Sequence, residues 1–133
     1  MPKKKRERPP AHGDLLYRKR LYEKIVGGNP RYLDALICLG NTYTRLGDFA
    51  GALRVDLRIA DILPGEPTVY YNLACDYSLL DNIEDALKNL RIALLCGYRD
   101  FRHLRQDEDL ANIRKDGRFA RLVENRDLFH EKH

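Results

Sequence analysis

Residues Leu33–Leu53 read LDALICLGNTYTRLGDFAGAL, and residues Pro67–Leu87 read PTVYYNLACDYSLLDNIEDAL. The two stretches carry the same pattern, because their equivalent positions lie 34 residues apart. The matching pairs are Leu39 and Leu73, Tyr43 and Tyr77, Leu46 and Leu80, Ala52 and Ala86, and Leu53 and Leu87. A fixed period of this length predicts a stack of similar supersecondary units.

Within each copy the spacing of apolar residues predicts a pair of helices. One face of the first helix is formed by residues at i, i+3, i+7 and i+10, namely Leu36, Leu39, Tyr43 and Leu46. Asp48 and Asn82 are suited to cap the second helix of their copies. Pro30 and Pro67 suit the first turn of a helix, where the missing N–H has no partner to lose. One such hairpin cannot bury its apolar face alone, so its neighbours must stack on it.

The motifs Leu36-x-x-Leu39-Gly40-x-x-Tyr43 and Tyr70-x-x-Leu73-Ala74-x-x-Tyr77 resemble the tetratricopeptide repeat (TPR) family. The resemblance implies an all-α fold, a short right-handed α-solenoid of TPR type with helical caps at both ends. After Gly97 the period breaks, and Asp107–Leu122 resembles the terminal cap of many bacterial TPR proteins. A bacterial source is therefore expected. The apolar residues expected to cover the end of the stack are Leu104, Leu110, Ile113, Phe119 and Leu122.

These patterns divide the chain into successive segments. We expect a disordered basic tail at 1–11, an N-terminal capping helix at 12–28, a first repeat at 29–64, a second repeat at 65–98, a C-terminal helical cap at 99–126 and a frayed tail at 127–133. The capping helix carries an apolar stripe of Leu15, Leu16, Leu21, Tyr22, Ile25 and Val26. Asp56 stands where the second copy has Leu90, which indicates either a shifted helix or a polar pairing.

The charge of the chain is concentrated at its start. The net charge is +4, and residues 1–10 hold five basic residues, Lys3, Lys4, Lys5, Arg6 and Arg8, against Glu7. The remaining 19 basic and 19 acidic residues cancel, so the folded part should not attract nucleic acid. The tail is interpreted as solvated, as a simple nuclear-import signal, or as a weak and salt-dependent contact with nucleic acid.

Composition argues against a membrane protein and against a disulfide framework. The sequence has no run of about 18 apolar residues and no secretory signal. Its three cysteines, Cys38, Cys75 and Cys96, are odd in number and lack a C-x-x-C spacing. Reduced thiols in the cytoplasm are the expected state.

No set of residues points to catalysis, so the protein is expected not to be an enzyme and to need no cofactor. His130 and His133 could hold a metal only weakly, so no metal site is expected. The acidic triplet Asp107–Asp109 lies beside several arginines in sequence. It is interpreted as a salt-bridged surface that also caps a helix.

The inner face of the repeat array is the candidate site, because in TPR arrays the first helices line a peptide groove. The residues expected to bind peptide are Ile37, Asn41, Thr44, Arg45, Tyr71, Asn72, Cys75, Arg102 and Arg105. An asparagine amide can bond a peptide N–H and C=O at once. Arginine suits a carboxylate through its planar fork.

This set resembles in part the carboxylate-clamp TPR domains, which hold the acidic tails of chaperones. Asn41 and Asn72 match the clamp asparagines and Arg102 falls where a clamp lysine lies, but Ile37 and Gln106 replace basic residues. The function expected is a non-catalytic adaptor or scaffold that binds a protein or peptide, with an acidic segment or a free carboxylate preferred. The alternatives are an accessory subunit that uses its convex face and cap, and a neutral groove whose arginines pair with the acidic triplet.

Overall fold

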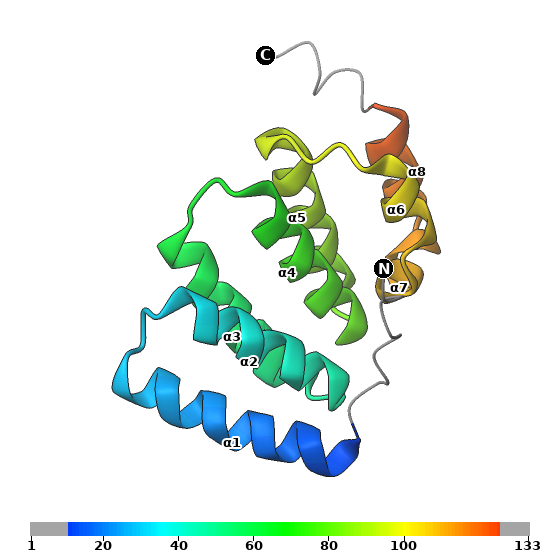
Figure 1. The fold of residues 1–133 in the computed structure, drawn as a ribbon. Coiled ribbons are helices and arrows are strands. Elements are labelled where there is room, and N and C mark those ends of the chain that lie inside the picture. Colours follow the sequence, from blue (N-terminus) through cyan, green and yellow to red (C-terminus); the bar gives the residue numbers. More distant parts are fainter. Residues whose placement is uncertain (1–10, 126–133) are drawn as a thin grey trace, which may run out of the picture.

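The structure is a computed structural model, and it describes residues 11–125. All regular structure in these residues is helical, which confirms the all-α class. In chain order the elements are α1 (His12–Gly28), α2 (Leu33–Arg45), α3 (Phe49–Ile62), α4 (Pro67–Leu79), α5 (Ile83–Cys96), α6 (Phe101–Gln106), the 3-10 turn η1 (Glu108–Leu110), α7 (Ala111–Arg114) and α8 (Gly117–Glu124) (Figure 1). None of the described helices is long and apolar enough to cross a membrane. The expected tails and the two C-terminal histidines lie outside the described residues, apart from Ala11.

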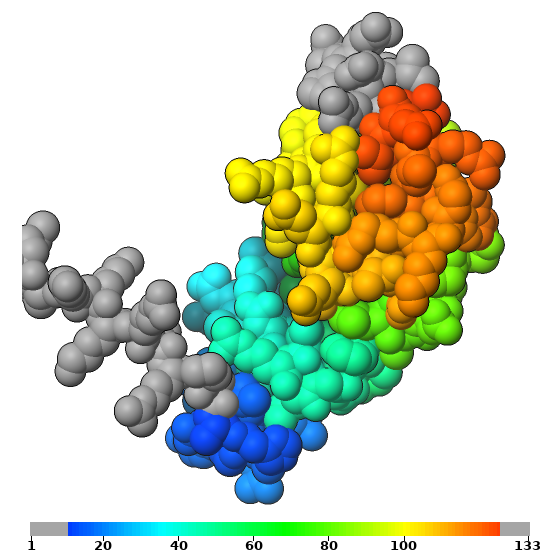
Figure 2. All heavy atoms as spheres, turned by 90° about the vertical axis from the view of Figure 1, so that its right-hand side faces the viewer, coloured from blue at the N-terminus to red at the C-terminus, as the bar shows by residue number. Residues whose placement is uncertain are grey.

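The helices form two hairpins that follow one another along the stack. The bounds of α4 and α5 lie 34 residues after those of α2 and α3 at both ends of each helix. α1 packs on α2, α3 packs on α4, and the segments after Gly97 contact α4 and α5 (Figure 1). Seen from the side in Figure 2, the chain passes from α1 at the bottom to the C-terminal segments at the top.

Each hairpin begins its second helix with the same kind of cap. The side chain of Asp48 accepts a hydrogen bond from the amide of Gly51 at 2.9 Å, and that of Asn82 accepts one from Asp85 at 3.3 Å. These bonds satisfy helix N-terminal amides, as the sequence predicted. The prediction for the prolines is half right, because Pro67 opens α4 but Pro30 lies in the turn before α2.

The first helix of each hairpin ends in a left-handed residue, and so does α5. These residues are Gly47 (φ 77°), Asp81 (φ 60°) and Gly97 (φ 116°). In each case the following amide donates to the carbonyl five residues earlier, at 2.9 Å. This hydrogen bond ends the helix and turns the chain back on itself.

The core consists of two apolar clusters joined through α4. The first lies between α1, α2 and α3, with Val69 of α4 added; the second lies between α4, α5 and the C-terminal segments. Leu104, Leu110 and Ile113 are fully buried in the second cluster, and Phe119 is 6% exposed. Leu122 packs against it as a partly buried residue. The five predicted cap residues therefore cover the end of the stack.

The apolar stripe predicted for α1 is only partly buried. Leu15 and Val26 lie in the core, but Leu21 and Ile25 are 41% and 39% exposed. The reason is that α1 packs mainly on α2, so only one face of α1 is well covered. The hydroxyl of Tyr43 in α2 adds a polar link to α1, donating to Glu23 Oε2 at 2.7 Å.

Candidate ligand-binding cleft

A cleft of about 330 Å³ opens between the first helices of both hairpins and the start of the C-terminal segments. Its lining residues are Gly40, Asn41, Thr44, Asp56, Tyr71, Asn72, Cys75, Asp76, His103, Asp107 and Asp109. They come from α2, α3, α4, α6, η1 and the residue before η1. We call this site the acidic cleft.

The name reflects the ionisable groups around the cleft. Four aspartates line it, and within residues 11–125 its lining contains no lysine or arginine. His103 is the one residue of the lining that can carry a positive charge. A cleft lined by one sign of charge concentrates the field and favours ligands of the opposite sign.

The carboxylate of Asp107 organises one wall of the cleft. Its Oδ2 accepts from the hydroxyl of Tyr71 at 2.5 Å, lies 3.2 Å from Nε2 of His103 and accepts a weak bond from the thiol of Cys75 at 3.8 Å. Its Oδ1 accepts from the amide of Asp109 at 3.0 Å, which caps η1. These contacts leave Asp107 little capacity to bind anything further.

Neighbouring groups support this wall. The ring of Tyr71 stacks on that of Tyr98, with centroids 4.4 Å apart and planes inclined by 3°. The guanidinium of Arg114 donates to the backbone carbonyl of Asp107. Burial and the hydrogen bond to Asp107 raise the pKa of Tyr71, so its hydroxyl stays a donor.

The opposite wall holds a pair of carboxyl groups, Asp56 and Asp76, which lie within hydrogen-bonding reach of each other. Asp76 is only 4% exposed, and its Oδ2 has no hydrogen-bond partner. Burial, followed by the interaction with Asp56, raises the pKa of Asp76, and burial raises that of Asp56. Two carboxyl groups this close favour sharing one proton. The polar pairing that the sequence allowed for Asp56 is therefore present.

Asp56 has room in this position because α2 carries a glycine opposite it. A β-carbon on Gly40 would lie 3.3 Å from Oδ1 of Asp56 and 3.5 Å from Cγ1 of Val55. The small residue therefore lets α2 and α3 approach while the carboxyl group stays between them.

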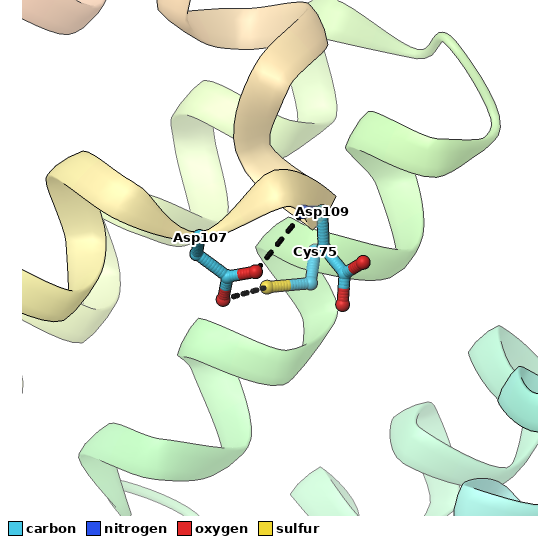
Figure 3. Close-up of side chains that lie close together, drawn as sticks. All are labelled: Cys75, Asp107 and Asp109. Carbon is cyan, nitrogen blue, oxygen red and sulfur yellow. Dashed lines mark hydrogen bonds between the residues drawn. The ribbon is translucent and has the colours of Figure 1, made fainter.

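Three groups lie close enough to suggest a metal site. The thiol of Cys75 and the carboxylates of Asp107 and Asp109 lie within 4.8 Å of one another (Figure 3). Burial raises the pKa of the Cys75 thiol, however, and a metal binds the thiolate. Asp107 is also already hydrogen-bonded through both oxygens. The arrangement is thus a hydrogen-bonded wall that a metal would have to rearrange.

Five of the nine predicted site residues line the acidic cleft and four do not. Those that line it are Asn41, Thr44, Tyr71, Asn72 and Cys75. Ile37 is 43% exposed and lies outside the lining. Arg45 lies instead in a hollow of about 150 Å³ between α1 and α2, beside Arg18 and Tyr22.

Arg102 and Arg105 are exposed on α6 and do not reach the cleft. The orientation of this short helix explains why the arginines lie outside the cleft. Leu104 is fully buried against the stack, which brings the neighbouring His103 to the cleft. The cleft therefore carries the opposite charge from the one predicted for the groove.

The sequence reasoning missed all four aspartates as cleft residues. Asp107 and Asp109 were interpreted as a salt-bridged surface, yet the carboxylate of Asp107 contacts Tyr71, His103 and Cys75. Helix capping by Asp107 was predicted correctly. The available signal was the acidic residue at 56, where the other copy has Leu90, together with Asp76, where the first copy has Thr42.

The chain is thus an all-α protein of stacked helical hairpins with an acidic cleft. No family model matches it. It is similar to a chloroplastic protein of Arabidopsis thaliana, with 34% identity over 94 residues that cover 66% of this chain. The chain spans only 27% of the length of that protein. Because that protein comes from a plant, the likeness gives no support to a bacterial source.

Proposed function

We propose that this chain is a protein-interaction module of the TPR type, which binds a segment of a partner protein in the groove across α2 and α4. The single observation behind this proposal is the acidic cleft, which spans both hairpins and the C-terminal segments. The 34-residue offset of the helix bounds supports the TPR assignment.

The side chains at the mouth of the cleft suit a peptide backbone. Asn41 and Asn72 are exposed, line the cleft and come from different hairpins. Each amide offers a donor and an acceptor, which an extended segment can use through its own N–H and C=O groups. Binding through the peptide backbone tolerates many sequences, so specificity must come from the cleft between Asn41 and Asn72.

The chemistry of the cleft supports a binding role without catalysis. Cys75 is the most nucleophilic group in the cleft, but burial and the nearby aspartates raise its pKa and keep it protonated. A catalytic cysteine needs the reverse environment, with nearby positive charge. The module is therefore proposed to be non-enzymatic.

A peptide array tests this function. Random immobilised peptides are probed with the wild-type chain and with the Asn41→Ala/Asn72→Ala variant. We expect a set of peptides to bind the wild type and to lose most of its signal with the double variant, whereas Asn29→Ala, an exposed asparagine at the end of α1, changes nothing. Equal binding by all three proteins would exclude the cleft as the binding site.

A second candidate function uses the opposite side of the stack. A groove of about 420 Å³ lies between α5 and α8, with Leu87 and Leu122 among its lining residues. Lys88, Arg91 and Arg121 also line it, while Arg118 is engaged with Glu84 and Asp116. This groove suits an acidic segment of a larger complex, as an accessory subunit would need. Lys88→Glu/Arg91→Glu would abolish that contact and leave binding in the acidic cleft intact.

A further inference from the structure

Resting on this proposed function, we infer that the acidic cleft takes a lysine or arginine side chain of the bound segment. The basis is the buried Oδ2 of Asp76, which has no hydrogen-bond partner within the described part of the protein and lies in a cleft lined by three further aspartates.

Asp76 carries this inference furthest. It is 4% exposed, lines the cleft, and its Oδ2 has no hydrogen-bond partner. An unpaired carboxylate oxygen in the protein interior is costly, because it has lost its water without gaining a donor. A donor supplied by a ligand would remove that cost only when the ligand is bound.

Two neighbouring carboxyl groups add acceptor oxygens to the cleft. Asp109 lines the cleft and is only partly buried, and Asp56 faces Asp76, with which it shares one proton. A lysine ammonium has three donors and no acceptor, and an arginine guanidinium has five donors and no acceptor. Either group therefore complements the acceptor oxygens of these aspartates.

The size of the cleft fits a single inserted side chain. Its volume of about 330 Å³ lies at the lower end of the range for small-molecule pockets. The segment would run along the exposed amides of Asn41 and Asn72 and would place one long basic side chain between the aspartates. The asparagines would thus bind the peptide backbone, and the aspartates would select the charge of the inserted side chain.

The structure favours this ligand over an acidic segment and over a metal ion. An acidic group would enter a cleft lined by four aspartates, while Arg45, Arg102 and Arg105 lie outside it. A transition metal would need the Cys75 thiolate and free oxygens of Asp107, and those oxygens already accept hydrogen bonds. A basic side chain can instead use Asp56, Asp76 and Asp109 without disturbing this wall.

The test starts from the array peptide whose binding depends most on Asn41 and Asn72. We expect it to contain lysine or arginine. Replacing that residue with norleucine, which keeps an alkyl chain but carries no charge, should weaken binding about tenfold or more, as for other charged hydrogen bonds.

Protein variants then locate the effect. Asp109→Asn, and separately the double variant Asp56→Asn/Asp76→Asn, should weaken binding of the basic peptide by a similar factor. Neither variant should change the affinity for the norleucine peptide. Asp61→Asn is the matched control, because Asp61 is an exposed aspartate on α3 outside the cleft. It should change neither affinity.

Three results would overturn the inference. If the norleucine peptide binds as tightly as the basic one, the cleft does not select charge, although the peptide-binding function stands. If no array peptide depends on Asn41 and Asn72, both proposals fail. If Zn²⁺ binds stoichiometrically, displaces the peptide and loses its affinity in Cys75→Ser, the cleft is a metal site.

Discussion

Asp76 lies inside the helix stack with one carboxyl oxygen unpaired and a second carboxyl group, Asp56, beside it. An asparagine at this position would keep the shape and supply an N–H donor to Asp56. We therefore expect Asp76→Asn to raise the free energy of unfolding at neutral pH by about 1 to 3 kcal/mol. Urea denaturation measures this change. A loss of stability would show that the carboxyl group of Asp76 makes a favourable interaction that an asparagine amide cannot replace.

The pKa of Asp76 gives the same site a pH dependence. Its folded-state pKa lies above the ordinary value of 3.8, so the native state binds the proton more tightly than the unfolded chain does. The stability that Asp76 gains from its tighter proton binding is fully present below about pH 4. It is lost as the pH rises toward and through the raised pKa of the folded state. The difference in unfolding free energy between Asp76→Asn and wild type should therefore grow between about pH 5 and about pH 8. A difference that is flat with pH would contradict this assignment.

Tyr71 is the second residue on which the cleft depends. Its hydroxyl donates to Asp107 at 2.5 Å and its ring stacks on Tyr98. Tyr71→Phe keeps the ring but removes a donor from a partly buried carboxylate, so we expect a loss of about 1 to 3 kcal/mol. Tyr17→Phe is the control, because Tyr17 is 69% exposed. Thermal or urea denaturation of both variants compares them, and equal stabilities would contradict a structural role for the hydrogen bond.

At the scale of elements, the turns between paired helices have the same backbone conformation but different residues at the left-handed position. Gly47 and Asp81 occupy equivalent positions, with φ values of 77° and 60°. A left-handed conformation costs a residue with a β-carbon about 1 kcal/mol, and glycine avoids this cost. Glycine also gives the unfolded chain more conformational freedom, which offsets part of its advantage. We expect Asp81→Gly to stabilise by roughly 0.5 kcal/mol and Gly47→Ala to destabilise by about 1 kcal/mol. Denaturation midpoints that move in the same direction for both variants would contradict this.

The helices were predictable from sequence because their signals are local. The repeat of Leu39, Tyr43 and Leu46 sets one helix face, and Asp48 and Asn82 satisfy nearby amides whatever else the chain does. Helix α1 was harder, because the sequence shows which residues are apolar but not how many neighbours will cover them. Leu21 and Ile25 are exposed for that reason.

The charge of the site was not predictable in the same way. Which side of α6 faces the cleft is decided by the burial of Leu104, and this places the exposed His103 at the cleft in place of the arginines beside it. The four aspartates of the cleft come from α3, α4 and the η1 region, up to 53 residues apart in sequence (56 to 109). Only tertiary packing brings such residues together.

At the scale of the whole molecule, the two apolar clusters meet through α4, so each end of the stack depends on its own cap. In a stacked array stability is close to a sum of units and nearest-neighbour interfaces. Leu110→Ala removes a fully buried side chain from the C-terminal cluster, and a loss of about 2 to 5 kcal/mol is expected.

The same variant tests how the loss is distributed. Hydrogen exchange should speed up more for amides of α4 and α5 than for amides of α2 and α3. Ala50→Gly, at an exposed position of α3, serves as a control for general destabilisation. An equal increase along the whole chain after Leu110→Ala would contradict the nearest-neighbour description.

The most direct test of the account is to map where a partner segment binds. The ¹⁵N-labelled chain is titrated with the best basic peptide from the array, and shifts of backbone amide signals are followed by NMR. We expect the largest changes at Asn41, Asn72 and Asp109, around the acidic cleft, and we expect the shifts to saturate at one peptide per chain. Changes confined to Lys88, Arg91 and Arg121 in the groove between α5 and α8 would contradict it.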